Sequence, residues 1–452
     1  MGARAMYELN EEKDPAVLGP FQLLAVLGQG GMGRTYLGRR LPLENLGPEL
    51  ETGYHLTEFR ESAQPALAAV KVIKPSKLRD SSEHSEEEAR ARFAQEIETM
   101  RTVASARVPA LLAADADAEQ PWLAMDYVHG STLHKLVHAC GPLPVGPYGA
   151  LGLALVDALR AIHGAKLLHR DLKPSNIALG PDGPVVLDFG LAVLTERDSD
   201  AALTKTGDGF GTPSYMSLEQ ATDTKHVTES ADIYSLGAVL FFAAAKRPPY
   251  PLAPLLTAPK WDGVHAPYLP LLGRILVQVE AQRPSLDEIE SDLRQLLAGH
   301  GLTEEAAADQ LRALVTGSGL IPELPTKALS DLADPEIQQA AQQAVNQGAA
   351  PDSPWAPDLF DEFLEAEAQD LEPLDVEAEP APGPATYVPT VVDPAPRPAL
   401  PAVTPVPAQP TVTSYRLAPP QPPATPESAV VPPVALRAAE RLRKAYAHSG
   451  RL

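Results

Sequence analysis

The feature that most constrains this chain is the segment His169-Arg-Asp-Leu-Lys-Pro-Ser-Asn176, followed by Asp188-Phe-Gly190. Phosphoryl transfer asks a protein for a carboxylate near the incoming hydroxyl and for oxygen ligands to Mg²⁺. Hard Mg²⁺ prefers carboxylate and carbonyl oxygens together with ligand phosphates. We therefore assign Asp171 to the hydroxyl and Asn176 and Asp188 to the metal. The combined pattern is too specific to arise often by chance.

A glycine-rich segment, Gly28-Gln-Gly30-Gly-Met-Gly33, follows a predicted strand at residues 21–27. Glycine lets backbone amides come close to phosphate oxygens. The motif alone is weak, because dinucleotide-binding folds share it and it also occurs as a turn without a ligand. The next residues, 34–37, predict a strand rather than a helix, which favours a hairpin that covers a nucleotide.

Lys71 lies in another predicted strand, residues 68–73. A lysine among apolar neighbours must direct its ammonium to an anion or keep it in water. The α and β phosphates of ATP would serve, with a helix glutamate holding the lysine in place. The helical pattern of residues 78–103 offers Glu96 first and Glu98 second, although such charges taken separately are more often surface charges.

The order of predicted elements divides the first 300 residues into two parts. Short apolar and polar alternation over residues 21–127 predicts strands, and helical spacing dominates from residue 147 onward. The clearest helices are residues 150–163, 232–245 and 286–297. Pro284-Ser285 marks the start of the last of these. The pattern predicts an α+β chain, with a mainly β part before a mainly α part.

With these motifs in this order, residues 20–297 resemble the protein kinase family, in particular the bacterial Hanks-type Ser/Thr kinases. The resemblance implies a bilobal fold with a β-rich N-lobe, residues 20–127, and an α-rich C-lobe, residues 128–300. It also implies transfer of the γ-phosphate of ATP to protein Ser/Thr hydroxyls, with Mg²⁺ or Mn²⁺.

The resemblance assigns roles to individual residues. Asp171, Lys173 and the Lys71–Glu96 ion pair match the catalytic residues. Asp232 matches the anchor of the catalytic loop, and Arg283 is expected to pair with Glu219. The residues that match the nucleotide site are Leu27, Gly28, Gly30, Gly33, Thr35, Ala69, Lys71, Met125, Asp126, Val128 and Ala178.

Substrate class follows from the same resemblance. Lys173, two residues after Asp171, and Thr212 in Gly-Thr-Pro are typical of Ser/Thr kinases. Thr204 and Thr206 match activation-loop autophosphorylation sites, where a phosphate would order the loop through arginine. The alternative is that they are ordinary loop threonines.

The sequence departs from the family pattern in the nucleotide pocket, at the end of the activation segment and in an insert. Thr35 replaces a valine and Ala178 is smaller than usual, so ATP contacts are reduced at about 0.8 kcal/mol per lost buried methylene. Leu218 replaces the proline before Glu219. An insert at residues 39–67 is either a docking surface or, more in keeping with its composition, a loop.

The remaining sequence predicts several further segments. Residues 1–19 form an N-terminal arm and residues 301–350 an accessory helical segment. Residues 351–433 are acidic and then proline-rich, which predicts a disordered linker. Residues 434–452 predict a short basic helix. Part of the tail could cover the substrate cleft, but a solvated linker fits its composition better.

Composition limits the partners. The net charge of −22 argues against general affinity for nucleic acid. No apolar run predicts a membrane span, and the single cysteine, Cys140, fits a cytoplasmic location. Partner hypotheses are protein substrates, phosphothreonine-reading proteins and a second copy in a homodimer. The alternative functions are a pseudokinase scaffold and, last, a small-molecule phosphotransferase.

Overall fold

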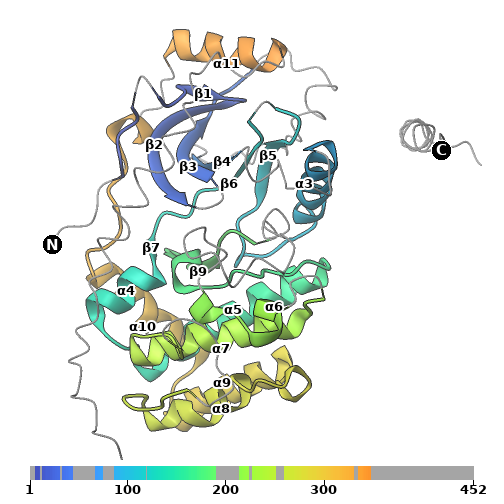
Figure 1. Ribbon diagram of the computed structural model, residues 1–452. Helices are drawn as coiled ribbons and strands as arrows, with labels where there is room; N and C mark the ends of the chain where they lie inside the picture. The colour runs from blue at the N-terminus through green and yellow to red at the C-terminus, as the bar shows by residue number, and fades with distance from the viewer. Residues whose placement is uncertain are drawn as a thin grey trace, which may run out of the picture. The chain divides into compact units, whose positions relative to one another are not determined.

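The computed structural model confirms a β-rich lobe followed by a helical lobe (Figure 1). It describes residues 6–10, 13–30, 33–43, 67–74, 86–118, 120–189, 213–222, 226–250, 259–329 and 334–347. All of them belong to the first of two units, residues 1–374. Outside the described residues lie Gly190, Thr204, Thr206, Thr212, most of the insert and the tail from residue 348.

The N-lobe is built on a six-stranded sheet in the order β1-β2-β3-β4-β6-β5, with antiparallel neighbours. The predicted strands at residues 21–27, 34–37 and 68–73 are β2, β3 and β4. The strands are β1 (Val17–Leu18), β2 (Phe21–Gly30), β3 (Gly33–Arg40), β4 (Leu67–Ile73), β5 (Leu111–Asp115) and β6 (Trp122–Asp126).

One face of this sheet packs against α3 (Glu86–Met100). Phe93, Ile97 and Met100 recur at helical spacing and are fully buried against sheet residues such as Ile73 and Leu123. The helical pattern predicted from residue 78 is therefore confirmed from Glu86 onward. This packing sets the position of Glu96, which lies one residue before Ile97.

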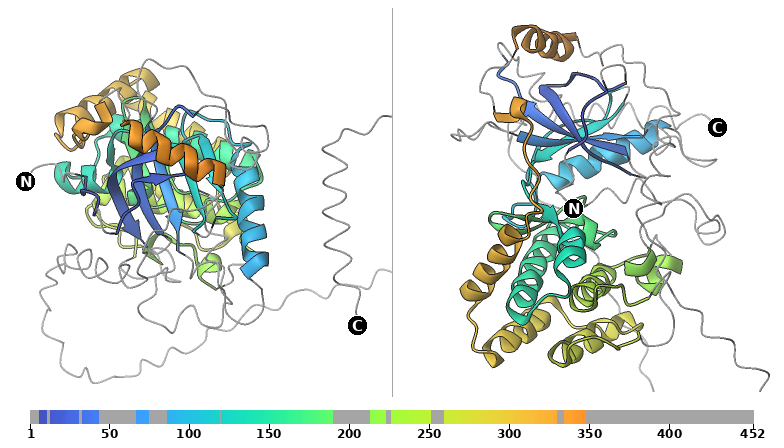
Figure 2. Two further views of the ribbon diagram at one scale, coloured as in Figure 1. Left: turned by 90° about the horizontal axis from the view of Figure 1, so that it is seen from above. Right: turned by 90° about the vertical axis from the view of Figure 1, so that its left-hand side faces the viewer.

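The other face of the sheet is covered by two segments. The N-terminal arm precedes the catalytic motifs in the chain, and residues 335–347 follow them. Strand alternation sends Val70, Val72 and Trp122 to this face, where Val345 of α11 (Pro335–Gln347) joins them. Figure 2 shows α11 lying across the sheet. The N-terminal arm contributes Asp14, which accepts hydrogen bonds from Arg34 Nη2 (3.0 Å) and Tyr36 Oη (2.9 Å).

The C-lobe is a helical bundle whose centre is α7. The predicted helices at residues 150–163, 232–245 and 286–297 are α5, α7 and α9. The helices are α4 (Leu133–Cys140), α5 (Val145–Gly164), α6 (Leu218–Thr222), α7 (Glu229–Ala245), α8 (Leu269–Ile275), α9 (Leu286–Gly299) and α10 (Glu304–Gly317). Short 3-10 turns are η1 (Pro174–Asn176), η4 (Pro213–Tyr215), η5 (Ala266–Tyr268), η6 (Glu280–Gln282) and η7 (Thr326–Leu329).

Two local features of the C-lobe follow from its sequence. Ser285 and Glu288 form a reciprocal capping box at the start of α9, as the Pro284-Ser285 signal predicts. The structure adds a small sheet of β7 (Ser131–Thr132), β8 (Ile177–Gly180) and β9 (Gly183–Val186), which the sequence did not predict. These strands are too short to show a periodic pattern.

One helix is long and apolar enough to meet the criterion for a membrane span. It is α5, and 72% of its apolar window is buried inside the fold. Its apolar side chains pack against α7, α9 and α10, as in a core helix. The sequence predicts no membrane span. The described residues contain one weak candidate, α5, and its burial in the helical lobe is that of a core helix.

Candidate active site

A buried carboxylate on α7 holds the catalytic loop. Asp232 accepts hydrogen bonds from the backbone N–H groups of His169 and Arg170 and lies 2.8 Å from His163 Nε2. Its burial alone would raise its pKa, but hydrogen bonding to His163 and the nearby charges hold that pKa below the ordinary value. The expected anchoring role of Asp232 is thus present in the structure, and the backbone before Asp171 has a fixed path.

The catalytic carboxylate lies beside two of its predicted neighbours. Lys173 Nζ is 2.9 Å from Asp171 Oδ2. Asn176 Nδ2 donates to the main-chain oxygen of Asp171 (2.9 Å) and to Asp171 Oδ2 (3.2 Å). Asp171 retains partial exposure, at 18% of its side chain. A carboxylate oriented by an amide, next to a cation and open to solvent, can receive a proton from a bound hydroxyl.

The two predicted metal ligands are brought together by the backbone. Leu187 N–H donates to the main-chain oxygen of Asn176 (2.8 Å), and His169 Nε2 lies 3.1 Å from Leu187 O. This places Asp188, just after β9, close to Asn176 at the end of η1. The side-chain nitrogen of Asn176 donates to Asp171. The side-chain oxygen of Asn176 is therefore left as a ligand for a cation. Burial would raise the pKa of Asp188, but Lys71 outweighs it and the pKa is lowered. An ionised carboxylate and an amide oxygen fit Mg²⁺.

The predicted Lys71–Glu96 ion pair is absent among the described residues. Lys71 Nζ instead lies 2.8 Å from Asp188 Oδ1, and only 6% of Lys71 is exposed. Burial raises the pKa of Glu96 to about 7, an effect that the charge of Arg170 partly opposes. The expected pairing is therefore not formed in this structure, where Asp188 is the carboxylate in contact with the ammonium.

The glycine-rich segment is a hairpin between β2 and β3, as predicted. Gly33 has a structural reason to be glycine, because a Cβ there would lie 1.8 Å from Val72 O of β4. A Cβ at Gly28 or Gly30 would meet no protein atom within 4 Å among the described residues. Packing among the described residues therefore does not explain these two glycines, and the open space beside them would let a ligand approach the backbone.

The predicted adenine residues come from five strands and the connection after β6. In the β-sheet register, Thr35 pairs with Gly28 and Lys71, and Ala69 pairs with Met125. Met125 and Ala178 are buried at 4% exposure, and Leu27 packs in a cluster with Tyr127. In the described part of the chain, the backbone N–H of Val128 donates to no protein acceptor. This N–H is the donor expected to bind adenine, and it lies two residues after Asp126 in the chain.

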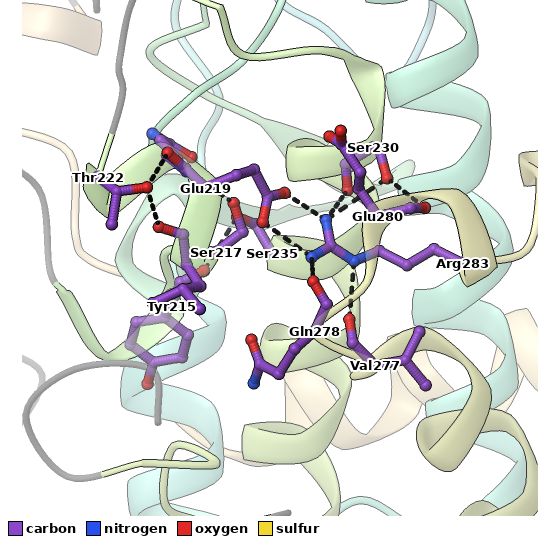
Figure 3. Close-up of polar contacts among 12 residues, drawn as sticks. Tyr215, Ser217, Glu219, Thr222, Ser230, Ser235, Val277, Gln278, Glu280 and Arg283 are labelled. Carbon is purple, nitrogen blue, oxygen red and sulfur yellow. Dashed lines mark hydrogen bonds and ion pairs between the residues drawn. The ribbon is translucent and has the colours of Figure 1, made fainter. Parts of the chain in front are cut away.

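The predicted Glu219–Arg283 salt bridge is present and bidentate (Figure 3). Arg283 Nη2 lies 2.9 Å from Glu219 Oε2, and Nη1 contacts Glu219 Oε1. The guanidinium also donates to the main-chain oxygens of Val277, Gln278 and Ser230. Leu218 in place of proline has therefore not removed this link between the activation segment and the helical lobe.

Three positioning residues escaped sequence reasoning. Gln220 Nε2 donates to Arg170 O (2.6 Å), and Ser235 Oγ donates to Tyr215 O (2.9 Å). The third is His163, next to Asp232. Each joins segments that are far apart in the chain, so no local spacing marks it. A polar residue at an apolar position of a helix, such as His163 in α5, is the one signal available.

Comparison with known proteins agrees with this geometry. The protein kinase domain family matches residues 56–299, more than half of the chain. The chain therefore belongs to the protein kinase family. The match starts after the glycine hairpin, which the structure supplies as part of the same lobe.

Bacterial Ser/Thr kinases are among the similar proteins. The Serine/threonine-protein kinase AfsK of Streptomyces coelicolor is 35% identical over 305 residues, 66% of this chain and 34% of that protein. The Probable serine/threonine-protein kinase PkwA of Thermomonospora curvata is 36% identical over 293 residues, 65% of this chain and 33% of that protein. PknB of Mycolicibacterium smegmatis is 31% identical over 350 residues, 73% of this chain and 48% of that protein. The chain thus spans about a third of the length of the first two.

Proposed function

We propose that this protein kinase transfers the γ-phosphate of ATP to Ser/Thr hydroxyls of proteins. The observation that carries the proposal is the convergence of Asp171, Lys173 and Asn176 at one end of the loop held by Asp232. Asp188 and Lys71 lie together on the nucleotide side. The similarity to bacterial Ser/Thr kinases supports the Ser/Thr class.

Each residue has one task in this reaction. Asp171 accepts the proton of the attacking hydroxyl, and Lys173 neutralises charge on the phosphate as it moves. A divalent cation, Mg²⁺ or Mn²⁺, held by Asn176 and Asp188 would neutralise the nucleotide phosphates. Lys71 pairs with Asp188 in the structure, and we propose that it turns to Glu96 and the phosphates once a cation occupies the carboxylate. The hydroxyl oxygen forms the new phosphorus bond while ADP leaves.

The test is phosphate incorporation from labelled ATP with each metal, comparing the wild type with Asp188→Ala and Asp171→Asn. We expect a fall of about 10²–10⁴ in rate for Asp171→Asn and loss of incorporation for Asp188→Ala. A metabolite substrate serves as control and should gain no phosphate. Equal incorporation in wild type and both variants would overturn the proposal. ATP binding without transfer under either metal would favour a scaffold instead.

Several finer parts of the proposal concern regulation and surroundings. Mapping of phosphorylated sites tests autophosphorylation at Thr204 and Thr206, whose removal to alanine should lower activity if phosphate orders the loop. A cytoplasmic location, protein substrates, phosphothreonine-reading partners and homodimer formation remain proposals of the same kind. Each rests on sequence and on the family.

A further inference from the structure

The structure continues beyond the family match. Residues 318–329 lead from the helical lobe to the N-lobe, and residues 335–347 form a helix on the N-lobe. We name residues 318–329 the strap; it connects α10 to the segment that leads to α11. The right-hand view of Figure 2 shows this orange chain rising beside the lobes, with η7 at its upper end and α11 above. The strap lies beyond residue 299, where the family match ends.

The strap is fixed at its lower end and alongside the hinge. Leu311 and Val315 of α10 are buried in the helical core, and Leu320 and Ile321 pack against the same core. Just beyond, the ring nitrogen Nε2 of His129 lies 2.8 Å from Pro322 O. A carbonyl oxygen only accepts, so His129 donates here. His129 directly follows Val128, which is the residue expected to bind adenine.

Between residues 324 and 328 the strap shares an apolar cluster with two parts of the nucleotide site. Leu324 and Ala328 belong to one apolar cluster with Leu27 and Tyr127. Leu27 is the residue before the glycine hairpin, and Tyr127 lies between Asp126 and Val128. Ala328 is fully buried, at 0% exposure. Two parts of the site that come from opposite ends of the N-lobe thus share a packing partner outside the family domain.

The upper end of the strap is anchored on the N-lobe. Arg39 Nη1 at the end of β3 donates to Lys327 O (3.2 Å). In α11, Gln338 Nε2 donates to Pro42 O (3.0 Å), and Ala341 and Val345 are fully buried against N-lobe side chains. The strap is therefore held at both ends, which keeps Leu324 and Ala328 in the apolar cluster that also contains Leu27 and Tyr127.

We propose that the strap and α11 position the nucleotide site by holding Leu27 and the hinge in place for adenine. The proposal rests on the proposed function, because it needs ATP as the ligand. Contacts to adenine are the same in the ground state and the transition state. Loosening them should raise the KM for ATP and leave kcat unchanged.

Two matched pairs of full-length variants test this. Ala328→Asp places a charge in the buried cluster, whereas Leu329→Asp places it on the neighbouring residue, which is 64% exposed. Ala341→Glu places a charge under α11, whereas Ala340→Glu places it on the exposed side of the same helix. His129→Phe removes the hydrogen bond to Pro322 and keeps an aromatic ring beside Tyr127, which tests the strap without burying a charge.

We expect Ala328→Asp and Ala341→Glu to raise the KM for ATP about tenfold at unchanged kcat, with the same change in the Kd of a fluorescent ATP analogue. His129→Phe should raise both about two- to threefold. Leu329→Asp and Ala340→Glu should match the wild type. Thermal unfolding identifies any variant that fails to fold, in which case His129→Phe decides.

The outcomes separate the two proposals. If the wild type binds the analogue and transfers phosphate, but folded strap variants keep wild-type KM and Kd, the positioning role is wrong. The same conclusion follows if the buried and exposed members of a pair change KM equally. If the wild type binds no nucleotide, the proposed function fails first.

Discussion

The sequence predicts two ion pairs, and the structure contains one of them. Glu219 and Arg283 meet in the helical lobe with a bidentate contact. Lys71 and Glu96 do not meet, and Lys71 contacts Asp188 instead. In both cases the residue types were right for pairing. The difference teaches that residue chemistry selects candidate partners, whereas the elements that carry them decide which pair forms.

The pKa values of Glu219 and Glu96 shift in opposite directions, in line with this contrast. Burial would raise the pKa of Glu219, but hydrogen bonds and charge from Arg283 lower it below the ordinary value. Burial raises the pKa of Glu96 to about 7 because no cation compensates as closely. Glu219 is thus held as an anion, while Glu96 exchanges its proton near neutral pH. A carboxylate of the second kind is suited to changing partners.

The largest effect is expected from breaking the formed pair. Arg283→Ala leaves Glu219 with an uncompensated charge and frees three main-chain oxygens, since the Arg283 side chain is 0% exposed. Loss of one partner of a buried pair costs about 3–5 kcal/mol. Chemical denaturation of the full chain measures it. Arg283→Lys keeps the charge but not the forked geometry, and should lose less. A loss below about 1 kcal/mol for Arg283→Ala would show that the pair is replaceable.

A smaller, pH-dependent effect is expected at the unformed pair. Because the folded pKa of Glu96 is raised from 4.5 to about 7, the folded chain binds more protons than the unfolded chain between these values. The free energy of unfolding therefore falls as pH rises through this window and levels off above it. Glu96→Gln cannot titrate. Its Tm should therefore rise relative to that of the wild type by roughly 2–4 °C as the pH is raised from 5 to 8.

Glu98→Gln is the matched control, because Glu98 is on the same helix but exposed. Its Tm should follow the wild type at every pH. A Glu96→Gln curve parallel to the wild type would mean that Glu96 is ionised at both pH values. That result would favour a paired Glu96 in solution.

Much of the catalytic loop could be predicted because its residues are close together in the chain. Asp171, Lys173 and Asn176 lie within one short segment, so one local backbone path brings them together. The partner of Lys71 could not be predicted in the same way. Glu96 and Asp188 are both carboxylates within reach of that strand, and the choice depends on how α3 and the segment after β9 are placed. Sequence spacing carries no information on that placement.

Docking of the two helices that flank the strap shows the same limit for the fold. Residues 301–350 predict helices, and α10 and α11 are present. Their partners are distant in the chain, since α10 packs on α5 and α11 on β1 and β2. An amphipathic pattern shows that a helix has an apolar face but not which surface it covers.

The smallest effect is expected for Arg160, which contacts more carboxylates than Arg283 but is less buried. Arg160 of α5 contacts Asp157, Asp287 and Glu290, yet 41% of its side chain is exposed. Exposed pairs contribute about 0–1 kcal/mol, because water already solvates the charges and salt screens them. Arg160→Ala should therefore cost at most about 1 kcal/mol in 0.1 M NaCl, and that cost should shrink in 1 M NaCl, whereas the loss from Arg283→Ala should persist. Equal losses for both variants would mean that burial of the guanidinium does not decide the strength of these pairs.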